Sequence, residues 1–316
     1  MSAFALTIAY IFGLIALGYL SGLTGLLKAE TGSALTDFVM TIALPALLFR
    51  TMITADFGAV APWSLWGAYF AAAAVSWLIG QAITAYVFRR DRRAAIIGGV
   101  TSAFSNLVLL GLPFVLSAFG HDGVSVLSLV VAVHLPTMLA VSVVLFALAP
   151  QEGSERVDAM REFRNFVRTL ATNPLVVGIL LGLLWRVGGL TLPPFGTRIV
   201  DTFAGIAGPL ALFSVGLGMR RFGLSGNLAP AAVLSTVKLG LMPLLVLGIS
   251  LLLHLPPLTA KVAVVSAAMP TGVNPYLFAM RFGAGQALSS NAMTIGTLVS
   301  ALTLTGWLAV VTALFG

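Results

Sequence analysis

The chain is a succession of long apolar stretches separated by charged residues or by clusters of Gly and Pro. A helix needs about 20 apolar residues to cross the hydrocarbon core of a bilayer. The pattern predicts helices at about 4–27, 34–54, 62–88, 94–119, 123–149, 173–190, 199–219, 229–254, 260–282 and 288–314. These stretches are continuously apolar and lack the polar–apolar alternation of a membrane β-barrel strand. We therefore expect an all-α membrane protein with ten transmembrane helices.

Composition supports a membrane protein and narrows its chemistry. The 316 residues are 59% hydrophobic and 9% charged, whereas about 25% charge is usual in soluble domains. Cys is absent and the three His are scattered, so disulfides, thiolate chemistry and a zinc cluster are not expected. The net charge of +7 includes no basic run interleaved with aromatics, which argues against nucleic acid as a partner. We expect the lipid bilayer as a partner, with no metal and no cofactor.

A polar segment at 151–172 divides the chain into two groups of five predicted helices. We expect a first five-helix repeat at 1–150, a cytoplasmic linker at 151–172 and a second repeat at 173–316. With the linker in the cytoplasm, the loops on its side carry most of the 17 Lys and Arg, as the positive-inside rule requires. Both termini then face the exterior. The first apolar stretch lacks a basic leader and a cleavage site and is interpreted as a spanning helix.

Residues recur between the two halves at nearly constant offsets. Asp37 precedes Pro45 by eight positions, and Asp201 precedes Pro209 by the same number. Because each half holds an odd number of helices, the second half must enter the membrane from the opposite face. This predicts a 5+5 inverted-topology repeat, an arrangement found in secondary transporters.

The fourth and ninth predicted helices, 94–119 and 260–282, are the least regular, because both contain Gly, Pro and Asn. Pro removes a backbone donor, and the residue before it is disfavoured in a helix. We expect both helices to break, and the peptide groups exposed at the breaks must line protein or a watery cavity, because only there are they tolerated at membrane depth. Paired broken helices predict a substrate site near the midplane, with helix N-termini that favour an anion. The alternative is that Pro and Gly only kink ordinary packing helices.

The polar residues of these helices are the candidate ligands. Asn106 and Asn274 occupy matching places in the two halves, and each amide offers donors and an acceptor. The alternative role for both is interhelical hydrogen bonding. Lys238, deep in the eighth helix, could hold a substrate carboxylate, form a structural ion pair with an acid such as Asp37 or Asp201, or extend its amine to the interface. The candidate substrate-binding residues are Asn106, Asn274, Ser105, Ser102, Thr271 and Lys238; the crossover or hinge candidates are Gly111, Pro113, Pro270, Gly272 and Pro275.

Three further ionisable residues are gating or proton-linked candidates. Asp37 and Asp201 are expected in the first turns of the second and seventh helices, where the helix dipole alone would explain an acid. Their matching positions also suit a role in gating or protonation. His134, in the middle of the fifth helix, could handle protons or, as a neutral imidazole, bond a freed carbonyl.

Enzyme signatures are missing, and most of the ten acids fall in predicted loops. The leading hypothesis is therefore a secondary transporter of small carboxylates and not an enzyme. The alternative is a membrane-embedded sensor that binds its ligand without transport.

Four motifs resemble the auxin efflux carrier family, and together they extend over most of the chain. They are SAFSNLVLLGLP at 102–113, NPLVVG at 173–178, KLGLMP at 238–243 and MPTGVNP at 269–275. The resemblance implies a fold related to the bile acid:sodium symporters, an elevator mechanism and an organic anion substrate such as malate, malonate or an auxin. It also implies a bacterial cytoplasmic (inner) membrane location, and fold analogy alone suggests a homodimer.

The resemblance assigns the paired crossover Asn to Asn106 and Asn274, and the crossover Pro to Pro113 and Pro275. Sodium-coupled proteins of this fold place an acid in the ninth helix, whereas residues 260–283 contain no Asp or Glu. This departure argues against sodium coupling and favours proton coupling or uniport.

Overall fold

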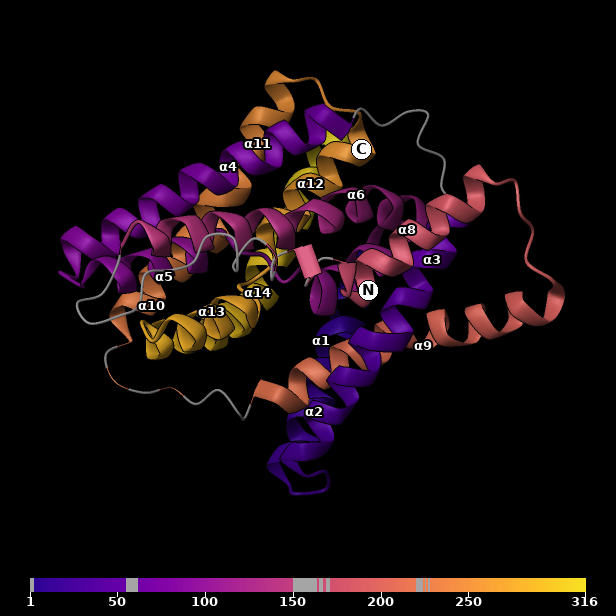
Figure 1. Cartoon of the computed structure of the whole chain (residues 1–316), viewed down its shortest axis with the longest axis horizontal. Helices are drawn as coiled ribbons and strands as arrows, with labels where there is room; N and C mark the ends of the chain where they lie inside the picture. The colour runs from indigo at the N-terminus through magenta and orange to yellow at the C-terminus, as the bar shows by residue number, and fades with distance from the viewer. Residues whose placement is uncertain are drawn as a thin grey trace. The chain divides into compact units, whose positions relative to one another are not determined.

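The computed structural model describes residues 3–54, 62–149, 164, 167–168, 171–219, 224, 226 and 228–316. All regular secondary structure in these residues is helical (Figure 1). The α-helices are α1 (Ala3–Leu23), α2 (Ala29–Phe38), α3 (Leu44–Thr54), α4 (Pro62–Ala82), α5 (Arg92–Ala103), α6 (Leu112–Ala147), α8 (Pro174–Val187), α9 (Pro194–Gly218), α10 (Ala229–Thr236), α11 (Met242–Leu252), α12 (Pro257–Ala268), α13 (Asn274–Phe282) and α14 (Gln286–Phe315). Short π-helical turns are η1 (Val39–Ala43), η2 (Ile83–Val87), η3 (Leu107–Gly111) and η5 (Val237–Leu241).

Seven helical stretches of the described residues are long and apolar enough to cross a membrane. One of them, Arg92–Ala147, combines the predicted helices 94–119 and 123–149, and two further apolar helices, α8 and α12, are shorter than 18 residues. The protein is therefore an all-helical, multi-pass membrane protein. The number of ten crossings and the inverted repeat stay predictions.

Several predicted boundaries were wrong. The helix expected to begin at 34 begins at Ala29, and the helix expected to begin at 199 begins at Pro194. Hydropathy located the apolar part of each helix and missed its polar first turns. In contrast, the predicted separation near residue 120 agrees with the structure, because Gly120 is non-helical, with φ 67° and ψ −161°, and divides α6 into two helical segments. Most of the predicted linker 151–172 lies outside the described residues.

The chain forms two compact units, and each takes segments from both halves of the sequence. Unit 1 comprises residues 1–60, 107–132 and 170–221, and unit 2 comprises 61–106, 133–169 and 222–316. These units are not the predicted repeats, which would each occupy one half of the sequence.

Unit 1 is held together by close helix contacts at glycines. Helices α1 and α2 pack against α9, and α3 packs against α8 (Figure 1). A Cβ on Gly216 would collide with the backbone carbonyl of Ile15, and a Cβ on Gly178 would lie 2.7 Å from the carbonyl oxygen of Pro45. Small residues that let backbones approach are the usual basis of helix association in membranes.

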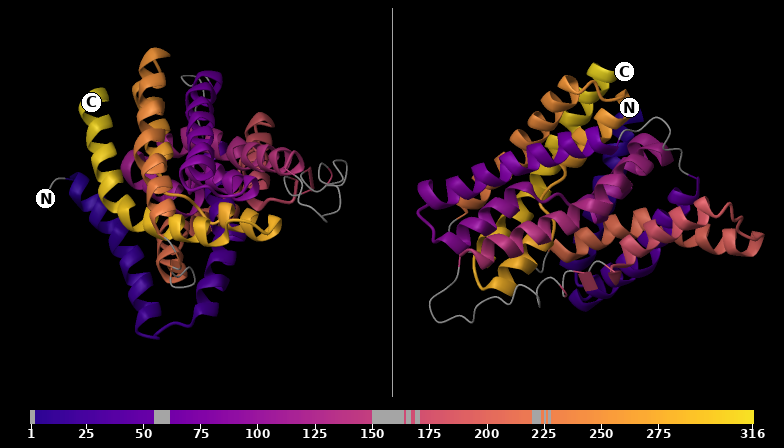
Figure 2. Two further views of the ribbon diagram at one scale, coloured as in Figure 1. Left: turned by 90° about the vertical axis from the view of Figure 1, so that its left-hand side faces the viewer. Right: turned by 45° about the horizontal axis from the view of Figure 1, so that its top comes forward.

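Unit 2 contains the residues around both predicted breaks. Helix α4 (purple in Figure 2) packs against α5 and α11, and α12 packs against both α11 and α14. Nearly every side chain of α5 and α12 is buried. These two short helices therefore form the buried centre of unit 2, with α4, α11 and α14 packed against them.

Arg93, in the first turn of α5, connects α5 to the ends of α6 and α13. Its guanidinium donates to the carbonyl oxygens of Ala149 at 3.0 Å and Phe282 at 2.8 Å, and it lies over the ring of Phe146. The rings of Phe146 and Phe282 are stacked, with centroids 4.0 Å apart. This planar, multidentate contact holds the ends of α6 and α13 against the start of α5.

Candidate functional site

The first interruption separates α5 from η3. Helix α5 ends at Ala103, and Phe104 is extended with φ −78° and ψ 118°. Helical structure resumes at Leu107, so Phe104, Ser105 and Asn106 form a non-helical segment.

The second interruption separates α12 from α13. Helix α12 ends at Ala268, Met269 is extended with φ −61° and ψ 139°, and α13 begins at Asn274. Pro270 lies inside this segment, and Pro275 occupies the first turn of α13, where its missing N–H costs nothing. The sequence therefore places both breaks correctly.

The two interruptions bind each other within unit 2. The backbone N–H of Asn106 donates to the carbonyl oxygen of Pro270 at 2.8 Å. The hydroxyl of Thr271 donates to the carbonyl oxygen of Thr101 at 2.7 Å. Gly272 lies so close that a Cβ there would be 3.4 Å from the Cα of Asn106. Peptide groups freed by one break are thus satisfied by the other, as burial in a membrane requires.

The side chains of Asn106 and Asn274 remain partly accessible, although Ser102, Ser105, Pro270, Thr271 and Gly272 around them are buried. Asn106 is the last residue of the first interruption, and Asn274 is the first residue of α13. The structure therefore brings the two interruptions together and leaves both predicted amides unburied.

A buried polar cluster supports the first interruption from α4 and α6. The hydroxyl of Tyr69 donates to Oγ of Ser105 at 2.8 Å, and the Ser105 N–H donates to Nε2 of His134 at 3.3 Å. The imidazole packs against the rings of Tyr69, Phe70 and Phe104. Because Nε2 accepts a bond, the neutral imidazole carries its proton on Nδ1. The expected role of His134 in holding freed backbone is thus partly met, with an N–H and not a carbonyl as its partner.

Lys238 supports the second interruption from η5. Its side chain is fully buried, and its ammonium donates to the carbonyl oxygen of Ala267, in the last turn of α12. Trp307 donates to the neighbouring Leu239 carbonyl oxygen at 2.8 Å. Within the described residues the ammonium bonds a backbone carbonyl and no carboxylate. This contact takes the place of the expected ion pair with an acid such as Asp37 or Asp201 and of an amine extended to the interface.

Three buried polar atoms near the interruptions have no partner among the described residues. They are the hydroxyls of Thr101 and Ser266, in the last turns of α5 and α12, and Nδ1 of His134. In contrast, Ser102 donates to the carbonyl oxygen of Gly98 in its own helix at 3.0 Å. Buried polar atoms normally have partners, so unpaired ones beside a helix break indicate a place that a ligand or water completes.

Sequence reasoning missed Tyr69, Thr101 and Ser266. Each lies in an apolar helix, where periodicity does not distinguish a hydroxyl that faces a site from one that bonds its own helix. The only available signal was distance from a predicted break. Thr101 lies three residues before Phe104, and Ser266 lies three before Met269.

The remaining hinge candidates lie in unit 1. Gly111 ends η3, and Pro113 is buried in the first turn of α6. The kink closest to them in α6 is at Gly120, which was not a candidate.

The expected positions of the two acids were wrong. Asp37 lies in the last turn of α2, and Asp201 is more than two turns inside α9. The influence of the helix dipole fades within the first turn, so it does not explain either acid. Asp201 instead pairs with Arg50 of α3, with Oδ1 3.4 Å from Nη1.

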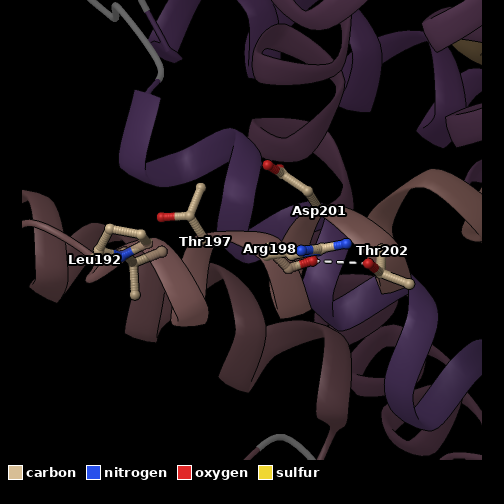
Figure 3. A pocket seen from close by; sticks show the side chains of 6 residues that line it. Leu192, Thr197, Arg198, Asp201 and Thr202 are labelled. Carbon is tan, nitrogen blue, oxygen red and sulfur yellow. Dashed lines mark hydrogen bonds between the residues drawn. The ribbon is translucent and has the colours of Figure 1, made fainter.

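A surface hollow on unit 1 is lined by one member of this pair, Asp201. Its lining residues are Leu192, Pro194, Thr197, Arg198, Asp201 and Thr202 (Figure 3). The Thr202 hydroxyl already donates to the Arg198 carbonyl oxygen at 2.7 Å. The hollow is open, and no buried unpaired group of the described residues lines it. It is therefore a weaker candidate than the interruptions. Within the described ranges, no three His, Asp or Glu side chains are close enough to hold a metal ion.

Relatives of this chain include named transporters. It is 26% identical over 307 residues to an uncharacterized transporter of Methanothermobacter thermautotrophicus, covering 95% of this chain and 96% of that one. It is 27% identical over 306 residues to a putative malonate transporter of Rhizobium meliloti, covering 94% and 92%. It is 30% identical over 168 residues to auxin efflux carrier component 6 of Arabidopsis thaliana, covering 49% and 28%.

The membrane transport protein family matches residues 3–308 of the chain. This match confirms the resemblance seen in the four sequence motifs. The chain therefore belongs to the membrane transport protein family that includes the auxin efflux carriers, and it is a transporter and not an enzyme.

Proposed function

We propose that this transporter moves small organic carboxylate anions, of malonate, malate or auxin type, through the site formed by the two interruptions. The observation that carries the proposal is that unit 2 holds, at or near the two interruptions, a fully buried ammonium, three buried polar atoms without a partner and two partly accessible amides. A similarity to a putative malonate transporter over nearly the whole chain supports the same substrate class.

The charge balance of unit 2 favours an anion. Among its described residues Asp91 is the sole acid, and it caps the start of α5 by accepting bonds from the backbone N–H groups of Arg93 and Ala94 at 3.0 Å. Helix α5 has 12 residues, which places the interruption about 18 Å from that cap at 1.5 Å per residue. Lys238 therefore has no nearby acid in the described part of unit 2, and a substrate carboxylate would supply the missing charge.

Helix ends add donors that suit a carboxylate. Helix α13 of unit 2 begins with Asn274. The first backbone N–H groups of a helix lack internal partners and carry partial positive charge. In our proposal the amides of Asn106 and Asn274 bind two ends of the anion, while Lys238 provides charge and His134 a further N–H.

The other candidates form the frame of the site. The hydroxyls of Ser102 and Thr271 are engaged with backbone carbonyls, and Ser105 accepts from Tyr69. We assign them to the wall of the site. Pro270, Gly272 and Pro275 keep the second interruption open, and Gly111 and Pro113 act as hinges in the segment that follows the first.

For the transport cycle we propose an elevator in which unit 2 carries the substrate. Each unit contains segments of both sequence halves, as expected if two inverted repeats intertwine.

We further propose uniport or proton coupling, a cytoplasmic 151–172 linker with exterior termini, a bacterial inner membrane location and a homodimer. Proton-linked roles for Asp37 and His134 belong to the same proposal, whereas the exposed pair with Arg50 makes a gating role for Asp201 the less favoured alternative.

The test is uptake of radiolabelled malonate, malate and indole acetate by purified protein in proteoliposomes. Asn106→Ala and Asn274→Ala should each lower uptake by about tenfold or more, because a charged substrate loses a hydrogen bond in a buried site. Asn173→Ser is the matched control, since it removes an amide but keeps a residue able to cap α8. Parent-like uptake by both alanine variants would refute the site. Substrate binding without flux would favour the sensor alternative.

A further inference from the structure

We propose that Lys238 is a positioning residue whose ammonium acts as a permanently bound cation at the carbonyl end of α12. Because this ammonium neutralises the helix end, anion binding needs no dissociable metal cation. The inference rests on the proposed function and concerns the coupling of the same site. If the inference holds, the transport of the anion does not depend on sodium.

The first observation is the place of the ammonium. The last four carbonyl groups of an α-helix lack helical partners and carry partial negative charge. Ala267 is the penultimate residue of α12, and its carbonyl oxygen accepts from Lys238. A cation bound at this end is stabilised by the helix dipole, and here the cation is covalently part of η5.

The second observation is that the ammonium is incompletely paired. A lysine ammonium has three donors, and one carbonyl oxygen is its partner within the described residues. A fully buried charge without a counter-charge is costly in a membrane protein and is usually functional. Lys238 is therefore suited to hold the helix end with one N–H and to leave its charge for an incoming anion.

The third observation is that the other interruption has no such cation. At the end of α5, the carbonyl of Val100 accepts from the Phe104 N–H at 2.8 Å, and that of Thr101 accepts from the Thr271 hydroxyl. These donors are neutral. The pair of interruptions thus carries one fixed positive charge, which matches one carboxylate.

The test replaces the tethered cation with a soluble one. Lys238→Ala removes the atoms of a propylamine, and we expect malonate uptake to fall by about 30-fold or more, as when one member of a buried charge pair is removed. Propylammonium should restore uptake several-fold and raise the melting temperature of Lys238→Ala. Lys238→Met fills the same space without charge, so it should lose uptake and gain nothing from propylammonium.

The matched control is Lys261→Ala. Lys261 lies on α12 and, like Lys238, donates to a carbonyl oxygen, here that of Gly316, but this contact is exposed. We expect parent-like uptake from Lys261→Ala, with no response to propylammonium. In the parent protein, replacing sodium by choline should change uptake and melting temperature little.

Three results would overturn the inference: parent-like uptake by Lys238→Ala, equal rescue of the alanine and methionine variants by propylammonium, or loss of parent uptake when choline replaces sodium. If the parent transports no carboxylate, the proposed function fails. The melting temperatures of the two variants with propylammonium then still decide whether a cation site exists. If Lys238→Ala does not fold, Lys238→Gln keeps a neutral donor to Ala267, and parent-like uptake from it overturns the inference.

Discussion

Both helix interruptions are held in place by polar contacts, but the groups that make these contacts differ in charge. The first, at 104–106, is held by neutral groups, with Tyr69 and His134 bonding Ser105. The second, at 269–273, adjoins a helix end held by a buried ammonium, Lys238. A neutral support fixes geometry, whereas a charged support also sets which ligand the site prefers. The difference suggests that the first interruption shapes the site and the second gives it its charge.

Beyond Lys238, the comparison predicts that the substitution with the largest effect on stability and uptake lies where the two interruptions meet. Thr271→Val removes the hydroxyl that bonds the Thr101 carbonyl oxygen and leaves that oxygen unpaired in a buried place. We expect a loss of about 2 kcal/mol in stability and a fall in malonate uptake of about tenfold. Thermal unfolding and proteoliposome uptake measure the two effects.

Thr236→Val is the control for this change, because Thr236 is exposed and bonds only the Ala232 carbonyl of its own helix at 3.1 Å. It should behave like the parent. If Thr271→Val and Thr236→Val are indistinguishable, the contact between the interruptions does not matter for transport.

A smaller effect should follow from weakening the neutral support. Tyr69→Phe keeps the ring in contact with His134 but removes the hydroxyl that bonds Ser105. A neutral hydrogen bond contributes about 1 kcal/mol, so we expect KM for malonate to rise several-fold while the maximal rate changes little. The concentration dependence of initial uptake measures this split.

Tyr86→Phe serves as the control, because the Tyr86 side chain is 82% exposed. A Tyr69→Phe protein with unchanged KM would show that the position of Ser105 does not influence substrate binding. A loss as large as that of Thr271→Val would contradict the ranking of the two contacts.

The sequence was sufficient to predict the interruptions, because Asn, Pro and Gly act on their own backbone. Pro270 and Pro275 disfavour one continuous helix through this stretch, although Asn274, the residue before Pro275, is itself the first residue of α13. The break at Asn106 was predicted because Asn106 holds the position in the first half of the chain that Asn274 holds in the second half. Local rules thus located both segments of the candidate site.

The partners of these segments were beyond sequence reasoning, because they depend on how distant helices pack. Tyr69 reaches Ser105 from a helix 36 positions away, and Lys238 reaches Ala267 across 29 positions. Lys238 stood out because a charge is rare in an apolar helix, whereas Tyr69 looked like any aromatic residue. Asp37 was misplaced for another reason, since hydropathy does not detect the polar start of α2.

The smallest effect should come from unit 1, where the Arg50–Asp201 pair provides a contrast to Lys238. Its carboxylate is 51% exposed and its guanidinium 22% exposed, and the two atoms are 3.4 Å apart. Exposed pairs contribute at most about 1 kcal/mol, and no unpaired buried group among the described residues lines the hollow beside Asp201. Arg50→Gln should therefore leave malonate uptake within about twofold of the parent. The opposite outcome would be an Arg50→Gln protein that keeps its melting temperature but has no uptake in proteoliposomes. Asp201 and Arg50 would then belong to a gate, and this charge pair of unit 1 would matter for transport as much as the buried ammonium of unit 2.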